Sequence, residues 1–97
     1  MNDSPMLAML KIDLGITTTK YDARLAQYLE SAKAEIEREG VNFASSLSVE
    51  DSNIIIQYAA WMWRKRDTGE GMPRILRWLI NNRLFSTQEI TNDVEES

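Results

Sequence analysis

The chain contains neither cysteine nor histidine. Without cysteine it can form no disulfide, has no thiol nucleophile and cannot build a zinc–thiolate site. Without histidine it lacks the most common general base and the most common transition-metal ligand in proteins. The missing cysteine fits a reducing compartment. The two absences together leave carboxylates, lysine and tyrosine for any acid–base chemistry.

The remaining polar groups show no pattern of catalysis or of a bound cofactor. Glu35, Glu37 and Glu39 are close in sequence, but a spacing of two turns side chains by about 200° around a helix, so they point in different directions. The Gly69-Glu-Gly71 turn lacks the lysine and the spacing of a phosphate-binding loop. We therefore expect a protein that is not an enzyme and that binds no cofactor or metal ion.

Long hydrophobic runs are also missing. The longest continuous apolar run is 58–63, far short of the about 20 residues that cross a membrane. The first residues show neither the basic nor the apolar region of a secretory signal peptide. We expect no membrane contact and a protein that is made and used in the cytosol.

Helical periodicity dominates what is present. The 97 residues, 43% of them hydrophobic and 27% charged, have the composition of one folded domain, 1–97. Start and stop signals place helices at about 5–14, 20–39, 49–67 and 73–85. We predict an all-α fold, a small bundle of about four helices with a short N-terminal helix and a flexible acidic C-terminal tail at 86–97.

Local signals predict the helix ends and the buried faces. Gly15 is expected as a C-cap, and Thr19 with Asp22 and Ser48 with Asp51 as capping-box-like starts. Residues 54–63 are apolar except for Gln57, and such a helix must be buried on all sides, so a neighbouring subunit could cover one of them. In the last helix, the residues expected to face inward are Ile75, Leu76, Leu79 and Ile80.

Charge is distributed unevenly around the net value of −4. Residues 1–51 carry five basic and nine acidic side chains, residues 52–83 six basic and two acidic, and residues 84–97 four acidic and no basic ones. Phosphate affinity grows with the number of basic contacts, so this is not the pattern of a general nucleic-acid binder. It favours subunits that meet head to tail, basic surface against acidic surface.

The segment 61–85 combines all three tryptophans with six of the eleven basic residues. It allows two interpretations, a small helix-turn-helix DNA-binding regulator or a protein-contact surface. The acidic flanks and the long turn, which contains Asp67 and Glu70, argue against DNA, whereas Trp and Arg are the residues enriched at binding hot spots. A role inside the core, with one tryptophan covered by an arginine, is the alternative for part of this set. The predicted contact residues are Trp61, Trp63, Arg64, Lys65, Arg66, Arg74, Arg77 and Trp78, facing an acidic surface that includes Glu30, Glu35 and Glu37.

The run Arg66-Asp-Thr-Gly-Glu-Gly-Met-Pro73 resembles the signature of the small head-tail connector proteins of long-tailed bacteriophages and related prophages. The preceding Trp61-Met-Trp and the following Leu76-Arg-Trp-Leu-Ile-Asn-Asn-Arg-Leu-Phe85 extend the likeness. A short helix ending in Leu14-Gly-Ile and a helix opened by Tyr21-Asp agree with it. The resemblance covers about residues 7–86.

The resemblance implies a structural adaptor of the virion neck that is assembled in the host bacterial cytoplasm. Such proteins form a ring of about a dozen copies of themselves below the portal protein after DNA packaging. The ring extends the DNA channel, helps to retain the genome and binds the next neck or tail-completion protein. Double-stranded DNA would pass through without sequence-specific binding, because an acidic subunit repels phosphates.

Overall fold

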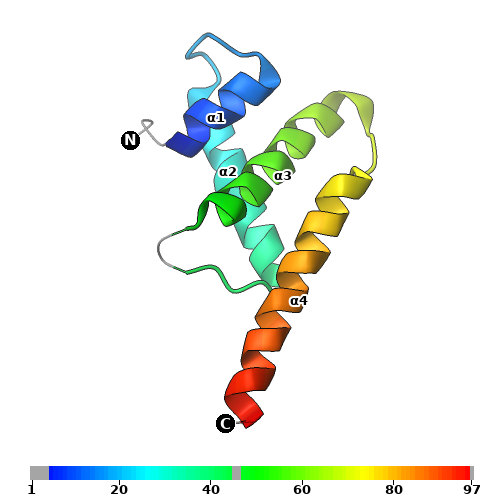
Figure 1. Ribbon diagram of the computed structural model, residues 1–97. Coiled ribbons are helices and arrows are strands. Elements are labelled where there is room, and N and C mark those ends of the chain that lie inside the picture. The colour runs from blue at the N-terminus through cyan, green and yellow to red at the C-terminus, as the bar shows by residue number, and fades with distance from the viewer. Residues whose placement is uncertain (1–4, 45–46, 97) are drawn as a thin grey trace.

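A computed structural model describes residues 5–44 and 47–96, with side chains in the last helix described as far as Ser86. These residues form four helices and no strand: α1 (Pro5–Leu14), α2 (Asp22–Arg38), α3 (Val49–Thr68) and α4 (Arg74–Glu96) (Figure 1). The predicted all-α bundle is confirmed. The C-terminal half of α4 projects beyond the other helices (Figure 1).

The central helix of the bundle is α3, which packs against α1, α2 and α4. In Figure 1, α2 passes behind α3, and α1 and α4 lie on either side of it. The segment from Ile54 to Trp61 is buried except for the half-buried Gln57. The chain therefore covers this apolar helix by itself, and no neighbouring subunit is needed to bury it.

Two of the three predicted helix ends are confirmed. Gly15 has a φ of +71°, and the Gly15 and Ile16 N–H groups donate to the carbonyls of Ile12 and Lys11 at 3.2 and 2.9 Å. These paired bonds close the C-terminus of α1 in the way that a left-handed glycine permits. At the start of α3, the Asp51 N–H donates to the Ser48 hydroxyl at 3.1 Å, as the capping box requires.

The predicted cap at Thr19 is wrong. The helix α2 begins at Asp22, its N-cap is Tyr21, and no side chain caps it. Thr19 accepts from the Asp22 N–H through its backbone carbonyl at 3.2 Å. The neighbouring Thr18 hydroxyl accepts from the Lys20 N–H, so the threonines form a tight turn ahead of the helix and do not cap it.

The inward face of α4 is narrower than the sequence predicts. Leu76 and Ile80 are buried and Leu79 is half-buried, as expected, but Ile75 is exposed. Because α4 packs on the bundle from one side only, a residue 100° away from Leu76 on the helix already faces outward. The helix also extends to Glu96, so it includes most of the segment that we expected to form a flexible tail. That 86–97 becomes ordered only on contact with a partner stays a prediction.

Candidate functional site

The three tryptophans lie in three different environments. Trp61 is buried, and its indole N–H donates to the Glu70 carbonyl oxygen at 3.2 Å, which ties the α3–α4 connector to the core. Trp63 is half-buried and makes edge contacts with Tyr21 and Tyr28, with ring centres 5.3 and 5.9 Å apart. Trp78 on α4 is 58% exposed. Of the three, only Trp78 presents a largely free indole to a partner.

The predicted basic residues are divided between in-chain contacts and open surface. Lys65 lies over the Trp61 ring at 4.3 Å, and the Arg66 guanidinium lies 3.8 Å from the centre of the Trp63 ring. These are cation–π contacts, so the sequence-based alternative of a tryptophan covered by an arginine holds for Trp63. Arg64 is exposed at the C-terminal end of α3, and Arg74 is exposed at the start of α4.

Arg77 lies apart from the other basic residues and faces α2. It binds the Glu39 carboxylate with two N–H groups, at 2.7 and 3.4 Å. This hydrogen bond, more than the nearby charge, raises the pKa of Arg77 above its usual value. Arg77 thus fastens α4 to the C-terminal end of α2.

The predicted acidic surface on α2 is partly used within the chain. Glu35 pairs with Arg38 at 2.8 Å, whereas Glu30 and Glu37 are exposed. Glu39, at the end of the same acidic stretch, pairs with Arg77 of α4 within the chain. The exposed carboxylates of Glu30 and Glu37 are the ones that another copy could reach.

An apolar stripe runs along the outer side of α4. Ile75, Trp78 and Phe85 are 58%, 58% and 63% exposed, and Arg74 borders them. We call these four residues the α4 face. Sequence reasoning identified Arg74 and Trp78 as contact residues but missed Ile75 and Phe85. Ile75 lies three residues before Trp78 and Phe85 seven residues after it, and these spacings place all three side chains on one side of a helix.

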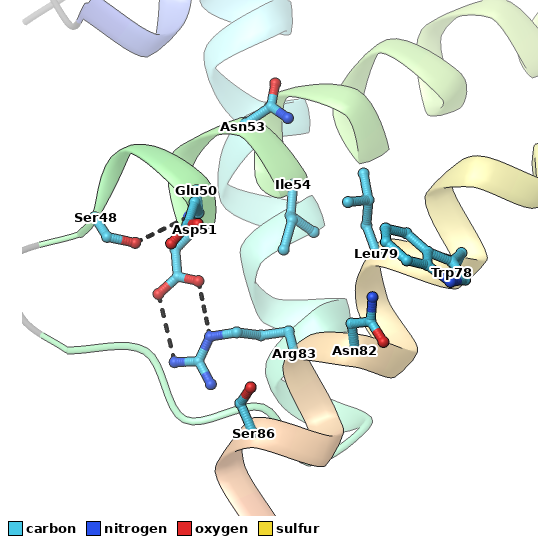
Figure 2. A pocket seen from close by; sticks show the side chains of 10 residues that line it. All are labelled: Ser48, Glu50, Asp51, Asn53, Ile54, Trp78, Leu79, Asn82, Arg83 and Ser86. Atoms are coloured by element: carbon cyan, nitrogen blue, oxygen red, sulfur yellow. Dashed lines mark hydrogen bonds and ion pairs between the residues drawn. The ribbon is translucent and has the colours of Figure 1, made fainter.

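A groove of about 520 Å³ separates the start of α3 from α4 (Figure 2). Its floor holds an ion pair that sequence reasoning also missed, in which Arg83 donates from Nε and Nη2 to the Asp51 carboxylate at 2.8 and 3.4 Å. The same guanidinium donates to the Asn42 carbonyl oxygen at 2.8 Å. One arginine therefore binds α4 to both the N-terminal turn of α3 and the α2–α3 loop. Trp78 stands at the rim of this groove (Figure 2).

The side chains exposed on these surfaces are mainly apolar and basic. Among the described residues, no group of three or more acidic side chains is arranged to hold a metal ion. The α3–α4 connector spans five residues, 69–73, and the outer side of the following helix carries Ile75, Trp78 and Phe85. A DNA-recognition helix presents polar side chains to the groove, so this hairpin does not match one. No helix in the described part of the chain is both long and apolar enough to cross a membrane.

Residues 5–75 match the sequence profile of the family described as phage gp6-like head-tail connector protein. The chain belongs to this family. The match covers α1, α2, α3 and the connector, and it ends in the first turn of α4. No curated protein and no solved structure matches the chain significantly.

Membership of the connector family assigns the chain a structural role in the head-tail connection of a phage particle, and this is not a family of enzymes. It confirms the resemblance noted in the sequence. The two exposed aromatic residues of the α4 face, Trp78 and Phe85, lie beyond the matched range, so their role has to be argued from this chain alone.

Proposed function

We propose that the protein assembles into a ring of about a dozen copies below the portal protein, extends the DNA channel, helps to retain packaged DNA and offers a platform to the next neck or tail protein. The observation that supports this best is the α4 face. A 97-residue chain that already buries Leu76 and Ile80 of α4 leaves Trp78 and Phe85 uncovered on the opposite side of the same helix. Large exposed apolar side chains gathered on one surface are typical of interaction sites.

The residues around Trp78 suit a subunit contact. A tryptophan surrounded by arginine provides a large apolar area together with directed polar donors, which is the composition of binding hot spots. Arg74 lies on the same face, and Arg64 is exposed at the adjacent end of α3. Four further predicted residues support this region from within the chain. Lys65 lies over the Trp61 ring and Arg66 over the Trp63 ring, and the Trp61 indole N–H holds the connector at Glu70.

A ring needs a second, different surface that receives the first. The exposed carboxylates Glu30 and Glu37 on α2 are the candidate that the charge pattern predicted. The net charge of −4 is also compatible with a channel, because an acidic lining would let DNA slide without gripping its phosphates.

Charge reversal at the α4 side tests this function. Arg64→Glu combined with Arg74→Glu should impair ring formation about tenfold or more, because a like charge placed in a contact costs several kcal/mol. Electron microscopy of the protein, alone and mixed with the portal protein, measures it. Arg66 is left intact because it covers Trp63.

Lys20→Glu is the matched control, since Lys20 is exposed in the α1–α2 loop, away from α4. It should leave rings unchanged, and circular dichroism should show the same helicity for all variants. Rings that form equally well with both arginines reversed would exclude this basic surface from the contact. A wild-type chain that forms no ring with or without portal would refute the proposed function.

A further inference from the structure

The first helix is apolar on both of its sides. Leu7 and Leu10 are buried in the bundle, and Leu14 packs against the same core. The opposite side consists of Pro5, Ala8, Met9 and Ile12, all exposed, with Met9 at 55% and Ile12 at 74%. We call these four residues the α1 face. Only Lys11 and Asp13 interrupt the apolar character of α1, so the α1 face is a candidate surface for a partner to cover.

The α1 face continues into a hollow between α1 and the start of α3. This groove has a volume of about 390 Å³, and Val49 at its edge is 86% exposed. Glu50 borders the same groove, whereas Asp13, one turn further along α1, lines a different groove with Arg64 and Ile75 of its own chain. The surface therefore combines an apolar depression with a carboxylate at its edge. Its apolar lining residues are Pro5, Met6, Met9, Leu47, Val49 and Ile56.

We propose that the α4 face of one copy covers the α1 face of the next copy, an inference that rests on the proposed ring. The two faces are complementary in shape and in charge. The α4 face offers projecting aromatic rings, Trp78 and Phe85, with a cation at Arg74, whereas the α1 face adjoins a hollow that the anion Glu50 borders. Placing opposite charges at the edges of an apolar contact fixes its orientation and rejects wrong pairings.

The two faces are of comparable length. From Arg74 to Phe85, the α4 face extends about 16 Å along the helix axis at about 1.5 Å per residue. From Pro5 to Ile12, the α1 face extends about 11 Å, and the whole ten-residue helix about 15 Å. Neither face needs to bend to lie along the other.

The placement of the two helices favours a head-to-tail contact. Both α1 and α4 pack on α3, on either side of it (Figure 1). The two faces stand on different helices, and the groove that Met9 lines shares no residue of either face with the groove that Trp78 lines. A copy that uses its α4 face toward one neighbour still has its α1 face free for another. This is the arrangement that closes into a ring.

The carboxylates on α2 are a poorer match for the α4 face. Glu30 and Glu37 share the exposed side of α2 with Arg24, and no large apolar side chain in the described α2 is exposed. A mixed-charge polar helix cannot remove the Trp78 and Phe85 rings from water in exchange for apolar contacts. The α1 face can, because all four of its residues are apolar.

Single substitutions followed by mixing test the proposal on the full-length chain. Met9→Asp disables only the α1 face, and Trp78→Asp disables only the α4 face. Each should weaken self-association about thirtyfold or more in sedimentation velocity, the loss typical of a hot-spot residue. Both sites are more than half exposed, so the monomers should keep their helicity by circular dichroism. Lys20→Glu, in the α1–α2 loop, is the control and should leave self-association unchanged. Glu30→Lys with Glu37→Lys tests the α2 carboxylates as the competing second surface.

Mixing the two variants gives the decisive result. The Met9→Asp copy retains its α4 face and the Trp78→Asp copy retains its α1 face, so the mixture should form one-to-one dimers and stop there. A mixture that stays monomeric at concentrations where the wild type associates shows that the faces do not meet each other. If Met9→Asp associates like the wild type while the α2 variant fails, the proposal is overturned but the ring stands. A wild-type chain that never self-associates refutes both.

Discussion

Removing Arg83 should destabilise the fold far more than removing any other arginine of α4. The Asp51 and Arg83 side chains are only 10% and 21% exposed, and together they join α4 to α3 and, through Asn42, to the α2–α3 loop. Arg83→Met keeps an unbranched apolar stem but leaves the Asp51 carboxylate buried without its cation. Breaking a buried pair in this way costs about 3–5 kcal/mol. Since Arg83 keeps some contact with water, we expect the lower end, about 3 kcal/mol.

The matched variant is Arg77→Met, on the same helix and with the same substitution. The Arg77–Glu39 pair is 43% and 30% exposed, so its loss should cost at most about 1 kcal/mol. The double variant Asp51→Leu with Arg83→Met removes both charges and should recover most of the stability, because an apolar pair of similar volume often replaces a buried ion pair without loss.

Urea unfolding followed by circular dichroism gives the four free energies of unfolding, with linear extrapolation to water. The decisive quantity is the difference between Arg83→Met and Arg77→Met. If the two variants lost the same free energy of unfolding, the burial of Asp51 would not contribute to the effect of removing Arg83. A double variant Asp51→Leu with Arg83→Met that is no more stable than Arg83→Met alone would contradict the explanation by an unpaired buried charge.

Two further outcomes follow from the geometry. Gly40 has a φ of +119°, and a Cβ added there would lie 3.2 Å from a methyl carbon of Leu84. Gly40→Ala should therefore lower the free energy of unfolding by about 1–3 kcal/mol in the same urea titration. Gly71→Ala is the control and should change this free energy little, because a Cβ added there meets no atom within 4 Å. Burial first, and then the carboxylates of Glu35 and Glu39, raise the pKa of Tyr58 above its ordinary value. A group whose pKa is higher in the folded chain stabilises the fold below its unfolded pKa, here about 10, and that contribution is lost as pH rises through the folded value. Unfolding measured across the alkaline range should therefore show stability falling above about pH 10, and Tyr58→Phe should remove that part of the decline, whereas an unchanged decline would contradict the assignment to Tyr58.

Local signals account for the part of the fold that the sequence predicted correctly. Gly15 and Ser48 act on backbone groups within a few residues of themselves, so their effects do not depend on the rest of the chain. The apolar stretch around Ile55 had to be buried whatever covered it. Thr19 does not cap α2 because the Asp22 N–H donates to the Thr19 backbone carbonyl, an equally local acceptor, and not to the Thr19 hydroxyl.

What the sequence did not predict depends on how α4 is set against the bundle. Periodicity shows that Ile75 and Leu76 are apolar, but only the direction of approach decides that Leu76 is buried and Ile75 exposed. The partners of Arg77 and Arg83 lie 38 and 32 residues away in the chain, so no local pattern could pair them. The predicted contact residues are not all on one surface for the same reason, since Arg77 faces α2 and Trp61 is buried in the core.

The two ion pairs that hold α4 against the bundle also fix the rotation of α4 about its own axis. Rotating α4 by one residue would swing its side chains by about 100° and pull both Arg77 and Arg83 away from their carboxylates. Only one rotational setting satisfies both pairs, and that setting determines where Trp78 points relative to α1. In a closed ring of about a dozen copies, each contact turns the chain by about 30°, and any error repeats at every step. In the proposed ring, a change of a few degrees in α4 would add or remove a subunit, so we expect Asp51 and Arg83 to influence the width of the channel although they need touch neither DNA nor the neighbour.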